Sequence, residues 1–404
     1  MGAPALRALR FTLALLVMPI LALCSASESL AIVLADALPN TSVKMPVRDA
    51  NAYASRAIQT MTGIRATRGS DLPDQALADG RRTFDAEPLN SGGVSLMAFG
   101  RQANGDAAGA RRLYQDALSI SKRDRFANMW LLEDASERGR VGDVLDRYDV
   151  LLRTGGAPAD LLLDVLGTAL REDAIVPYLA QRLANRPPWS EAFWLKVTPS
   201  PGAIANVGRL RLRLIKQHVP NPAGNDADIL RRLVANGQYG IAFSLFDALT
   251  GTKRQGSEIV HNANFTQSPR FPPLDWETFT AAGYNAQVDP VSGALTFYVE
   301  DSVEAVVARQ LMAAAPGAYV LSYRTPNADP FGTTRATVRL RCADDGGEEL
   351  VSIPITSLAA SAPVRLAGGA CGYVWLEVAA AHAGKTAAAR GDALIGQISL
   401  RASE

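Results

Sequence analysis

The spacing of apolar residues changes once along this chain, between Ile259 and Val288. Before this stretch, apolar residues recur every three to four positions, as on the buried face of amphipathic helices. After Gly293 they alternate with polar residues, as in strands that bury one face. Apolar residues with the helical spacing would not all lie on one face of a strand, and alternating apolar residues would not all lie on one face of a helix, because side chains point in different directions in the two elements. The sequence therefore predicts a helical domain followed by an antiparallel β-sandwich.

The length of 404 residues is enough to bury two hydrophobic cores. We expect a targeting segment over 1–40, a helical repeat domain over 41–253 and the sandwich over 254–404. The 41 Lys and Arg residues are balanced by 40 Asp and Glu residues, so the charge pattern does not favour a nucleic-acid partner. Only 7% of residues are aromatic against 48% that are hydrophobic, which favours Ala- and Leu-rich helical packing.

The amino-terminal segment has the pattern of a membrane-targeting signal. Arg7 and Arg10 precede the apolar run Phe11–Leu23, and small residues follow at Cys24–Ala26. A cleaved signal peptide and a retained anchor are both consistent with this pattern. The apolar character continues to Leu38, which favours the anchor, since a spanning helix needs about 20 residues. In either case the two arginines predict that the rest of the chain lies outside the cytoplasm.

Two cysteines, Cys342 and Cys371, lie in the strand-rich part of the chain. In an oxidising compartment they are most simply a disulfide, and two buried free thiols are the alternative. The sequence has no CxxC motif and no cluster of Cys and His, so we predict no zinc site.

The helical region contains an internal repeat. With a step of about 34 residues, Gly105 aligns with Gly139 and Tyr114 with Tyr148. Each unit combines two amphipathic helices with a Gly-centred turn, and a later unit has its turn at Gly237. The same spacing of small, aromatic and apolar residues occurs in two units: Ala110, Tyr114 and Ala117, and Ala242, Phe246 and Leu249. The period is blurred between Asp160 and Pro222.

These residues resemble the tetratricopeptide repeat, in which small residues let paired helices approach and an aromatic fills the groove between them. The resemblance implies a solenoid with a concave surface that binds protein partners. The aromatic residues of this region are interpreted as core: Tyr114, Trp130, Tyr148, Trp189, Phe193 and Trp194. The basic residues are interpreted mainly as solvated helix faces, with a minority available to an acidic partner: Arg111, Arg112, Lys122, Arg123, Arg125, Arg138 and Arg140.

Six strands are predicted in the last third of the chain, with one or two more around Ile259 and Trp276. Each is an alternating segment bounded by Gly, Pro, Asp or Asn. They are 294–301, 317–325, 334–343, 349–356, 371–379 and 393–403.

Four short motifs in this region resemble those of the galactose-binding-like jelly rolls, which include many carbohydrate-binding modules. The motifs are Asn262–Phe265, Leu274–Trp276, Pro316–Tyr319 and Gly396–Leu400. The resemblance covers roughly Gly256 to Glu404 and implies a jelly-roll sandwich that binds a glycan. Such domains often carry an acidic residue after the opening aromatic that helps to bind structural calcium. This chain has Thr266 there, so we expect neither that metal nor another cofactor.

Sugar binding requires exposed aromatic rings, which stack on the C–H faces of pyranoses, with polar side chains beside them for the hydroxyl groups. Trp276 and Trp375 lie in apolar strand patterns, so a core position is favoured for both. Tyr284 lies in a Gly-Tyr-Asn turn, where core and ligand contact are equally reasonable. The candidate ligand-binding residues are Trp276, Tyr284, Asn285, Gln287, Tyr323, Arg324 and Trp375.

The sequence contains no phosphate-binding loop, HExxH, GxSxG or dinucleotide-binding fingerprint, and its three histidines are scattered. We therefore expect no catalytic activity. The order of the domains resembles non-catalytic accessory proteins of bacterial surface-polysaccharide production. That resemblance implies a place on the periplasmic side of the inner membrane, protein partners on the solenoid and polysaccharide on the jelly roll. The alternatives are a purely protein-binding scaffold, and a lyase or hydrolase with its site at the domain junction.

Overall fold

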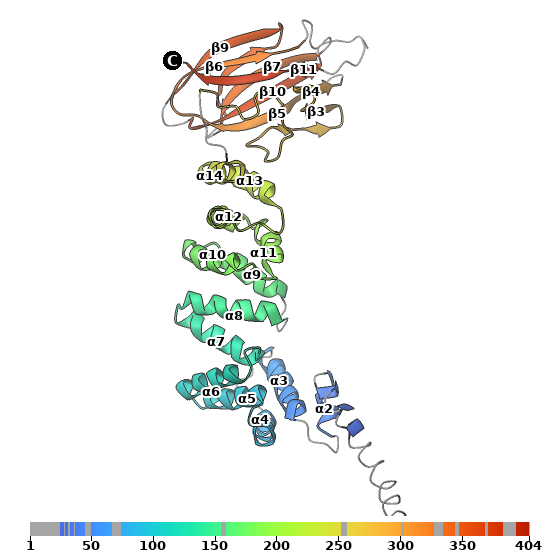
Figure 1. The fold of residues 1–404 in the computed structure, drawn as a ribbon, viewed down its shortest axis with the longest axis vertical. Coiled ribbons are helices and arrows are strands. Elements are labelled where there is room, and N and C mark those ends of the chain that lie inside the picture. The colour runs from blue at the N-terminus through green and yellow to red at the C-terminus, as the bar shows by residue number, and fades with distance from the viewer. Residues whose placement is uncertain are drawn as a thin grey trace, which may run out of the picture. The chain divides into compact units, whose positions relative to one another are not determined.

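The computed structural model describes most of the chain: 25–27, 29–30, 33–35, 37–44, 50–66, 74–154, 159–251, 257–300, 303–326, 334–343, 347–367, 371–382 and 393–403. Helices precede strands along the sequence, as predicted (Figure 1). Cα packing divides the chain into two compact units, Met1–Leu162 and Leu163–Glu404. The second unit contains both the last helices and all of the strands found among the described residues.

The first unit is helical, and successive helices from α3 to α6 and from α6 to α8 pack on one another. Its helices are α2 (Pro39–Ser42), α3 (Ala50–Ala66), α4 (Asp74–Ala86), α5 (Ser91–Ala103), α6 (Ala107–Ile120), α7 (Arg125–Glu137) and α8 (Val141–Thr154). Helix α9 (Ala159–Ala169) spans the boundary between the units. The second unit continues with η1 (Asp173–Ile175), α10 (Val176–Ala184), α11 (Ser190–Val197), η2 (Pro201–Ala203), α12 (Ile204–Lys216), α13 (Asp226–Ala235) and α14 (Tyr239–Thr250).

The predicted glycine turns separate the predicted helix pairs. Gly105 has φ +80 between α5 and α6, Gly139 has φ +66 between α7 and α8, and Gly237 has φ +70 between α13 and α14. These left-handed values favour glycine because a Cβ atom is disfavoured there. The repeated glycines in the sequence therefore mark real chain reversals.

The aromatic residues interpreted as core are buried. Tyr114 stacks on Trp130 with ring centroids 4.6 Å apart, and Ala98, Ala110 and Ala117 of the same cluster are fully buried. Tyr148, Trp189, Phe193 and Trp194 are buried as well. Small residues beside a large ring let the helices approach closely, which is the packing that the repeat pattern predicts.

Three of the basic residues form ion pairs with one buried carboxylate, Asp134. Arg111 donates two hydrogen bonds to it, at 2.6 and 3.0 Å, while Arg138 and Arg140 lie 3.1 and 3.2 Å away. The hydrogen bond from Arg111 lowers the pKa of Asp134 from its ordinary value. Arg111 therefore links α6 to α7, while Arg138 and Arg140 pair with Asp134 from the end of α7 and the turn after it.

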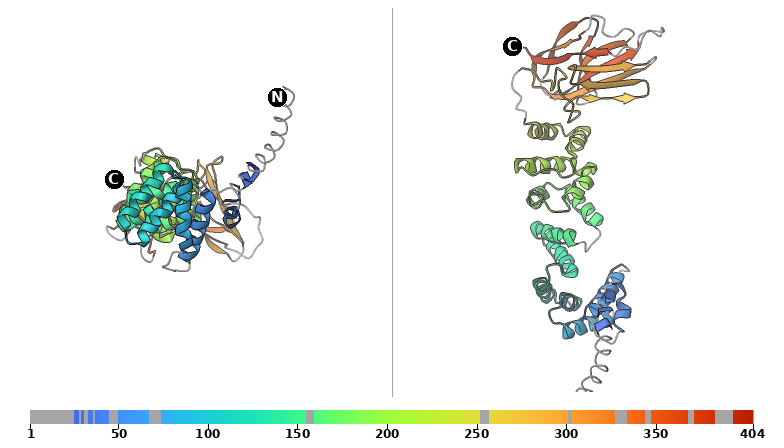
Figure 2. Two further views of the ribbon diagram at one scale, coloured as in Figure 1. Left: turned by 90° about the horizontal axis from the view of Figure 1, so that it is seen from below. Right: turned by 45° about the vertical axis from the view of Figure 1, so that its right-hand side comes forward.

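The strands of the second unit form two layers (Figure 2). They are β1 (Glu277–Thr278), β2 (Thr280–Ala281), β3 (Tyr284–Asp289), β4 (Ala294–Val299), β5 (Glu304–Ala313), β6 (Gly317–Arg324), β7 (Thr334–Cys342), β8 (Glu349–Pro354), β9 (Ala359–Leu366), β10 (Tyr373–His382), β11 (Ala393–Ile395) and β12 (Gln397–Ala402). One layer has the order β1-β5-β10-β7-β8. The other joins β11-β4-β3-β2 to β12-β6-β9 through the consecutive strands β11 and β12.

All strand pairs are antiparallel, and the chain crosses between layers from β5 to β6 to β7 and from β8 to β9 to β10. This wrapping confirms the predicted jelly-roll sandwich. The core lies between the layers and includes Leu295, Phe297, Leu340, Leu376 and Ile398. The predicted disulfide between Cys342 and Cys371 is present, with a Cα–Cα distance of 5.2 Å.

Strand β5 is a central strand that the alternation pattern did not predict. Val307, Ala308, Gln310, Leu311 and Met312 are all buried, so apart from Arg309 this part of the strand is covered on both faces. A strand covered on both faces has no polar side to alternate with its apolar side. Strand β9, whose edge position accommodates Pro363, was also not predicted.

Within the described ranges, no helix combines the length and apolar character needed to cross a membrane. The predicted targeting run Phe11–Leu23 lies outside those ranges.

Candidate functional site

The outer face of the five-stranded sheet carries an ordered set of charged and aromatic side chains. On β7, Ala336, Val338 and Leu340 point into the core. The residues between them therefore point outward, because successive side chains of a strand alternate between its faces. The outward residues of β7 are Arg335, Thr337, Arg339 and Arg341.

The antiparallel register aligns these arginines with outward residues of β10. Arg341 lies opposite Trp375, and Arg339 lies opposite Glu377. On the other side of β10, Leu311 of β5 lies opposite Trp375 and Arg309 lies opposite Glu377. Two neighbouring rows of outward side chains thus cross three strands of the sheet.

The second of these rows alternates in charge across four strands. It runs from Glu277 on β1 through Arg309 and Glu377 to Arg339 on β7. Arg309 Nε lies 2.7 Å from Glu277 Oε2, and Arg339 Nε lies 2.7 Å from Glu377 Oε2. The Glu377 side chain is only 10% exposed, whereas that of Arg309 is 35% exposed. The row is therefore a partly desolvated set of paired hydrogen-bond donors and acceptors.

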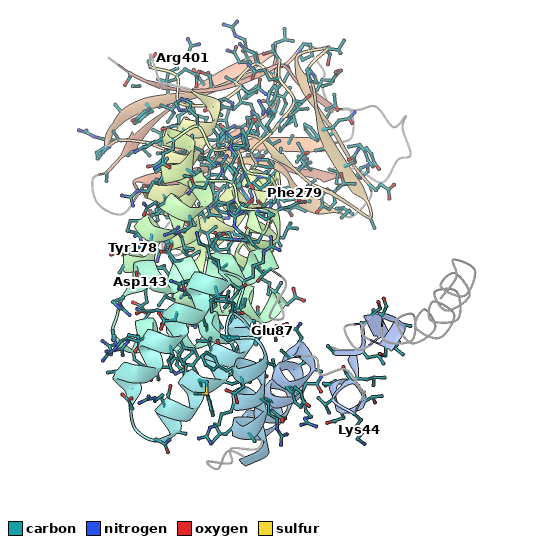
Figure 3. All side chains as sticks on the ribbon, turned by 60° about the horizontal axis from the view of Figure 1, so that its bottom comes forward. Lys44, Glu87, Asp143, Tyr178, Phe279 and Arg401 are labelled. Carbon is teal, nitrogen blue, oxygen red and sulfur yellow. A yellow bond between two sulfur atoms is a disulfide. The ribbon has the colours of Figure 1, made fainter. Side chains whose placement is uncertain are left out.

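Trp375 lies beside this row and is held by it. The guanidinium carbon of Arg309 lies 4.4 Å from the centroid of the Trp375 ring and 5.2 Å from that of Phe279, which Figure 3 labels. Such a contact fixes both the cation and the indole ring by electrostatic attraction. The indole remains partly exposed, so part of its surface is accessible to a ligand.

A second guanidinium lies beside the same row. Arg341 donates from Nε to the carbonyl of Gly347 at 2.9 Å, and its Nη1 lies 4.0 Å from Glu377 Oε2. Its side chain is 36% exposed. Arg341 thus presents further N–H donors next to Trp375.

Two of the sequence-predicted ligand residues lie in the core instead. Trp276 is 1% exposed, packs on Phe265, and donates from Nε1 to the carbonyl of Asn262 at 3.2 Å. Tyr323 is also 1% exposed, and its hydroxyl donates to the carbonyl of Pro354 at 3.3 Å. Both point inward from their segments, so neither reaches a ligand on the surface.

The other predicted residues lie on the opposite layer from Trp375. Tyr284 is half-buried against the core, whereas Asn285 and Gln287 do not belong to the core cluster. Asn285 accepts a hydrogen bond from the hydroxyl of Thr280. Arg324 is exposed at the end of β6, opposite Gln397. Because Trp375 belongs to the other sheet, the predicted set does not form one binding surface.

Sequence reasoning missed most of the residues that surround Trp375. They are Glu277, Phe279, Arg309, Arg339, Arg341 and Glu377. One signal was available, because Arg-x-Thr-x-Arg-x-Arg alternates along the predicted β7 segment and Glu377 follows Trp375 at the same spacing. The pairing register of these strands could not be predicted from the sequence of either strand alone.

Other features of the second unit give weaker candidates. Among the described residues, no group of three or more His, Cys, Asp or Glu side chains is arranged to hold a metal ion. An open groove of about 430 Å³ lies at the start of α14 and is lined by Arg209, Leu212 and Tyr239, among others. Arg209 already donates to Asp173 and Asn206, at 3.0 and 2.7 Å. The outer face around Trp375 is therefore the better candidate.

Comparisons with known proteins do not assign the chain to a family. No family model matches it, and no curated protein matches it. Among solved structures, it is similar to a structure described as "CBM4 structure and function", with 13% identity, a TM-score of 0.28, and coverage of 36% of this chain and 99% of that one. For TmCBM61 in complex with β-1,4-galactotriose the identity is 14%, the TM-score 0.24, and the coverage 36% and 99%.

A structure of accessory secretory proteins 1, 2 and 3 from Streptococcus pneumoniae is also similar, with 8% identity and a TM-score of 0.23. It covers 38% of this chain and 99% of the other. Likenesses at this level carry no argument about function.

Proposed function

We propose that the outer face of the five-stranded sheet binds a glycan, and that the protein is a non-catalytic accessory component of polysaccharide biosynthesis or export. The observation that carries this proposal is the partly exposed Trp375 beside a row of paired arginines and glutamates. An indole face stacks on the C–H face of a pyranose, while fixed donors and acceptors bind its hydroxyls.

Within the row, the charged groups are paired with each other, which suits the hydroxyl groups of a sugar. Arg309 is paired with Glu277, and Arg339 is paired with Glu377. A site for phosphate or carboxylate needs an excess of cations, whereas these pairs offer N–H donors and carboxylate acceptors side by side. A sugar hydroxyl both donates and accepts, so it matches such an array.

The remaining parts of the proposal rest on the sequence. The helical domain would hold a protein partner, as stacked helix pairs usually do. The amino-terminal segment and the disulfide support a position outside the cytoplasm, on the periplasmic side of a bacterial inner membrane. In this proposal the helices attach the protein to an assembly and the sandwich contacts the glycan.

Binding of the intact chain to a panel of immobilised neutral and acidic polysaccharides tests the proposal. We expect retention on at least one neutral polysaccharide, and at least a tenfold loss of affinity for Trp375→Ala. The matched control is Tyr298→Ala, which removes a ring that is 39% exposed on the other layer. Equal retention of wild type and Trp375→Ala would refute this site.

The same binding experiment distinguishes the proposal from two other functions. A purely protein-binding scaffold would show no retention on any polysaccharide while still capturing a protein partner. A lyase or hydrolase would release new reducing ends or unsaturated products from a bound polysaccharide during long incubation. Only retention without product release agrees with the proposal.

A further inference from the structure

Helix α14 differs from a terminal helix of a repeat domain because it has two buried faces. It packs on α12 and α13, and Ala242 and Leu245 are fully buried. Tyr239, Phe243 and Phe246 follow one another at i, i+4 and i+7, which places them on a second stripe of the helix. The outer face of a last repeat is usually polar, so this aromatic stripe requires a partner.

That partner is the β-sandwich of the same compact unit. Phe243 stacks on Tyr373 with ring centroids 5.6 Å apart and an interplanar angle of 11°. Tyr239 packs on the same ring at 4.9 Å, and its hydroxyl donates to the carbonyl of Ala343 at 3.3 Å. We call these residues, together with Phe246 and its neighbours described next, the α14 interface.

The far end of the stripe makes a second set of contacts. Phe246 meets the ring of His261 edge-on at 5.2 Å and the ring of Phe271 at 6.1 Å. Edge-on pairs at these separations are favourable contacts that add to the burial of the rings. The helix is therefore held at both ends of its aromatic stripe.

The disulfide lies next to the residues that receive α14. Ala343 directly follows Cys342, and Tyr373 lies two residues after Cys371. The backbone N–H of Ala343 also donates to the carbonyl of Tyr373 at 2.9 Å. The bridge and this hydrogen bond together join the end of β7 to the start of β10 at the point where Tyr239 and Phe243 make contact.

We propose that the Cys342–Cys371 bridge serves to hold the α14 interface, so that opening the bridge releases α14 from the sandwich while the sandwich stays folded. Strand ends open locally at a lower free energy than the centres of strands, which lie in the most stable part of a domain. A covalent link at the strand ends removes that local opening. The sandwich core includes Leu340 and Leu376, which lie further along the two strands, so it does not depend on the bridge in the same way.

Thiol–disulfide exchange with an added dithiol provides the perturbation. One thiolate of the dithiol attacks a sulfur of the bridge, and its second thiolate resolves the mixed disulfide. The Sγ–Sγ bond of the protein breaks, two electrons and two protons end on Cys342 and Cys371, and the dithiol leaves as a cyclic disulfide.

Hydrogen exchange of the full-length chain, followed by mass spectrometry of its peptides, tests the proposal. Wild type before and after dithiol treatment is compared with Cys342→Ser/Cys371→Ser. Tyr373→Ala removes the receiving ring and leaves the bridge intact, and Tyr298→Ala is the matched aromatic control on the other layer. Peptides of α14 report the interface, and peptides of β12 report the folded sandwich.

We expect exchange in α14 to become at least tenfold faster in the reduced protein, in the double variant and in Tyr373→Ala, with β12 unchanged. The control Tyr298→Ala should match wild type. Unchanged exchange in α14 after loss of the bridge would overturn the proposal. Equal loss of protection in α14 and β12 would also overturn it, because the bridge would then support the whole sandwich.

Discussion

The two tryptophans of the sandwich should respond to the same truncation to very different extents. Trp276 lies in the core and Trp375 lies on the outer face of the five-stranded sheet, although both occur in apolar, strand-like sequence. We expect Trp276→Ala to destabilise the sandwich strongly. Trp375→Ala should destabilise it weakly and act mainly on ligand binding.

The magnitudes follow from burial and contacts. Trp276 is 1% exposed, and removing a fully buried tryptophan side chain costs about 3–5 kcal/mol of unfolding free energy. The substitution also leaves the carbonyl of Asn262 without its indole N–H donor. Trp375 is partly exposed, and its contact with Arg309 at 4.4 Å is worth about 1–2 kcal/mol. The two variants should therefore differ by about 1–4 kcal/mol, which is about a fivefold difference or more in the unfolding equilibrium.

The assay must report the sandwich alone, because a chain with two compact units need not unfold in one step. Urea titration read by hydrogen exchange in peptides of β6 and β12 meets this condition. The reasoning is refuted if Trp375→Ala lowers the stability of these strands as much as Trp276→Ala does.

Three further predictions concern single residues. The hydrogen bond from Arg111 lowers the pKa of Asp134, so this carboxylate stabilises the fold above its unfolded pKa of about 4, and the stabilisation is lost as pH falls through the lower folded pKa. Asp134→Asn should therefore destabilise the first unit at pH 7. The loss of stability in urea denaturation should become smaller towards pH 2. Burial raises the pKa of Asp275, so the folded protein binds more protons above pH 4 than the unfolded chain, and its stability falls as pH rises through that window. The stability of wild type relative to Asp275→Asn should therefore decrease from pH 4 upward. A stability difference that does not change with pH would contradict the burial effect. Gly139 has φ +66, and a Cβ added there would meet no atom within 4 Å, so Gly139→Ala should cost about 1 kcal/mol of unfolding free energy through backbone strain alone. Gly372 has similar space and no positive φ, so Gly372→Ala should cost less. Thermal denaturation of both variants measures the difference.

Much of the architecture was predictable from local pattern. The glycine turns at Gly105, Gly139 and Gly237, the buried aromatics of the helices and the six alternating strands each follow from a few neighbouring residues. Strand β5 was not predictable in this way, because most of its residues are buried on either face and its apolar residues do not alternate. The repeat pattern predicts that Phe246 fills the groove between helices, yet this ring contacts His261 and Phe271 of the sandwich. A helical period shows that a residue faces a neighbour but does not identify that neighbour.

The candidate site shows the same division. The sequence supplied Trp375 as a candidate and correctly joined Cys342 to Cys371, but it did not single out the outward arginines of β7. It could not distinguish Trp375 from Trp276, because hydrophobic pattern alone does not reveal which face of a segment is covered.

By itself, the sequence determined the order of the domains, the type of most elements and the glycine turns between helix pairs, since these depend on neighbours in the chain. The tertiary structure alone decided which strands pair and in which register. That register places Arg309 over Trp375, 66 residues away in the chain, and Arg339 on Glu377, 38 residues away. Contacts between distant segments depend on which strands become neighbours, so the site became visible only when the sheet was assembled.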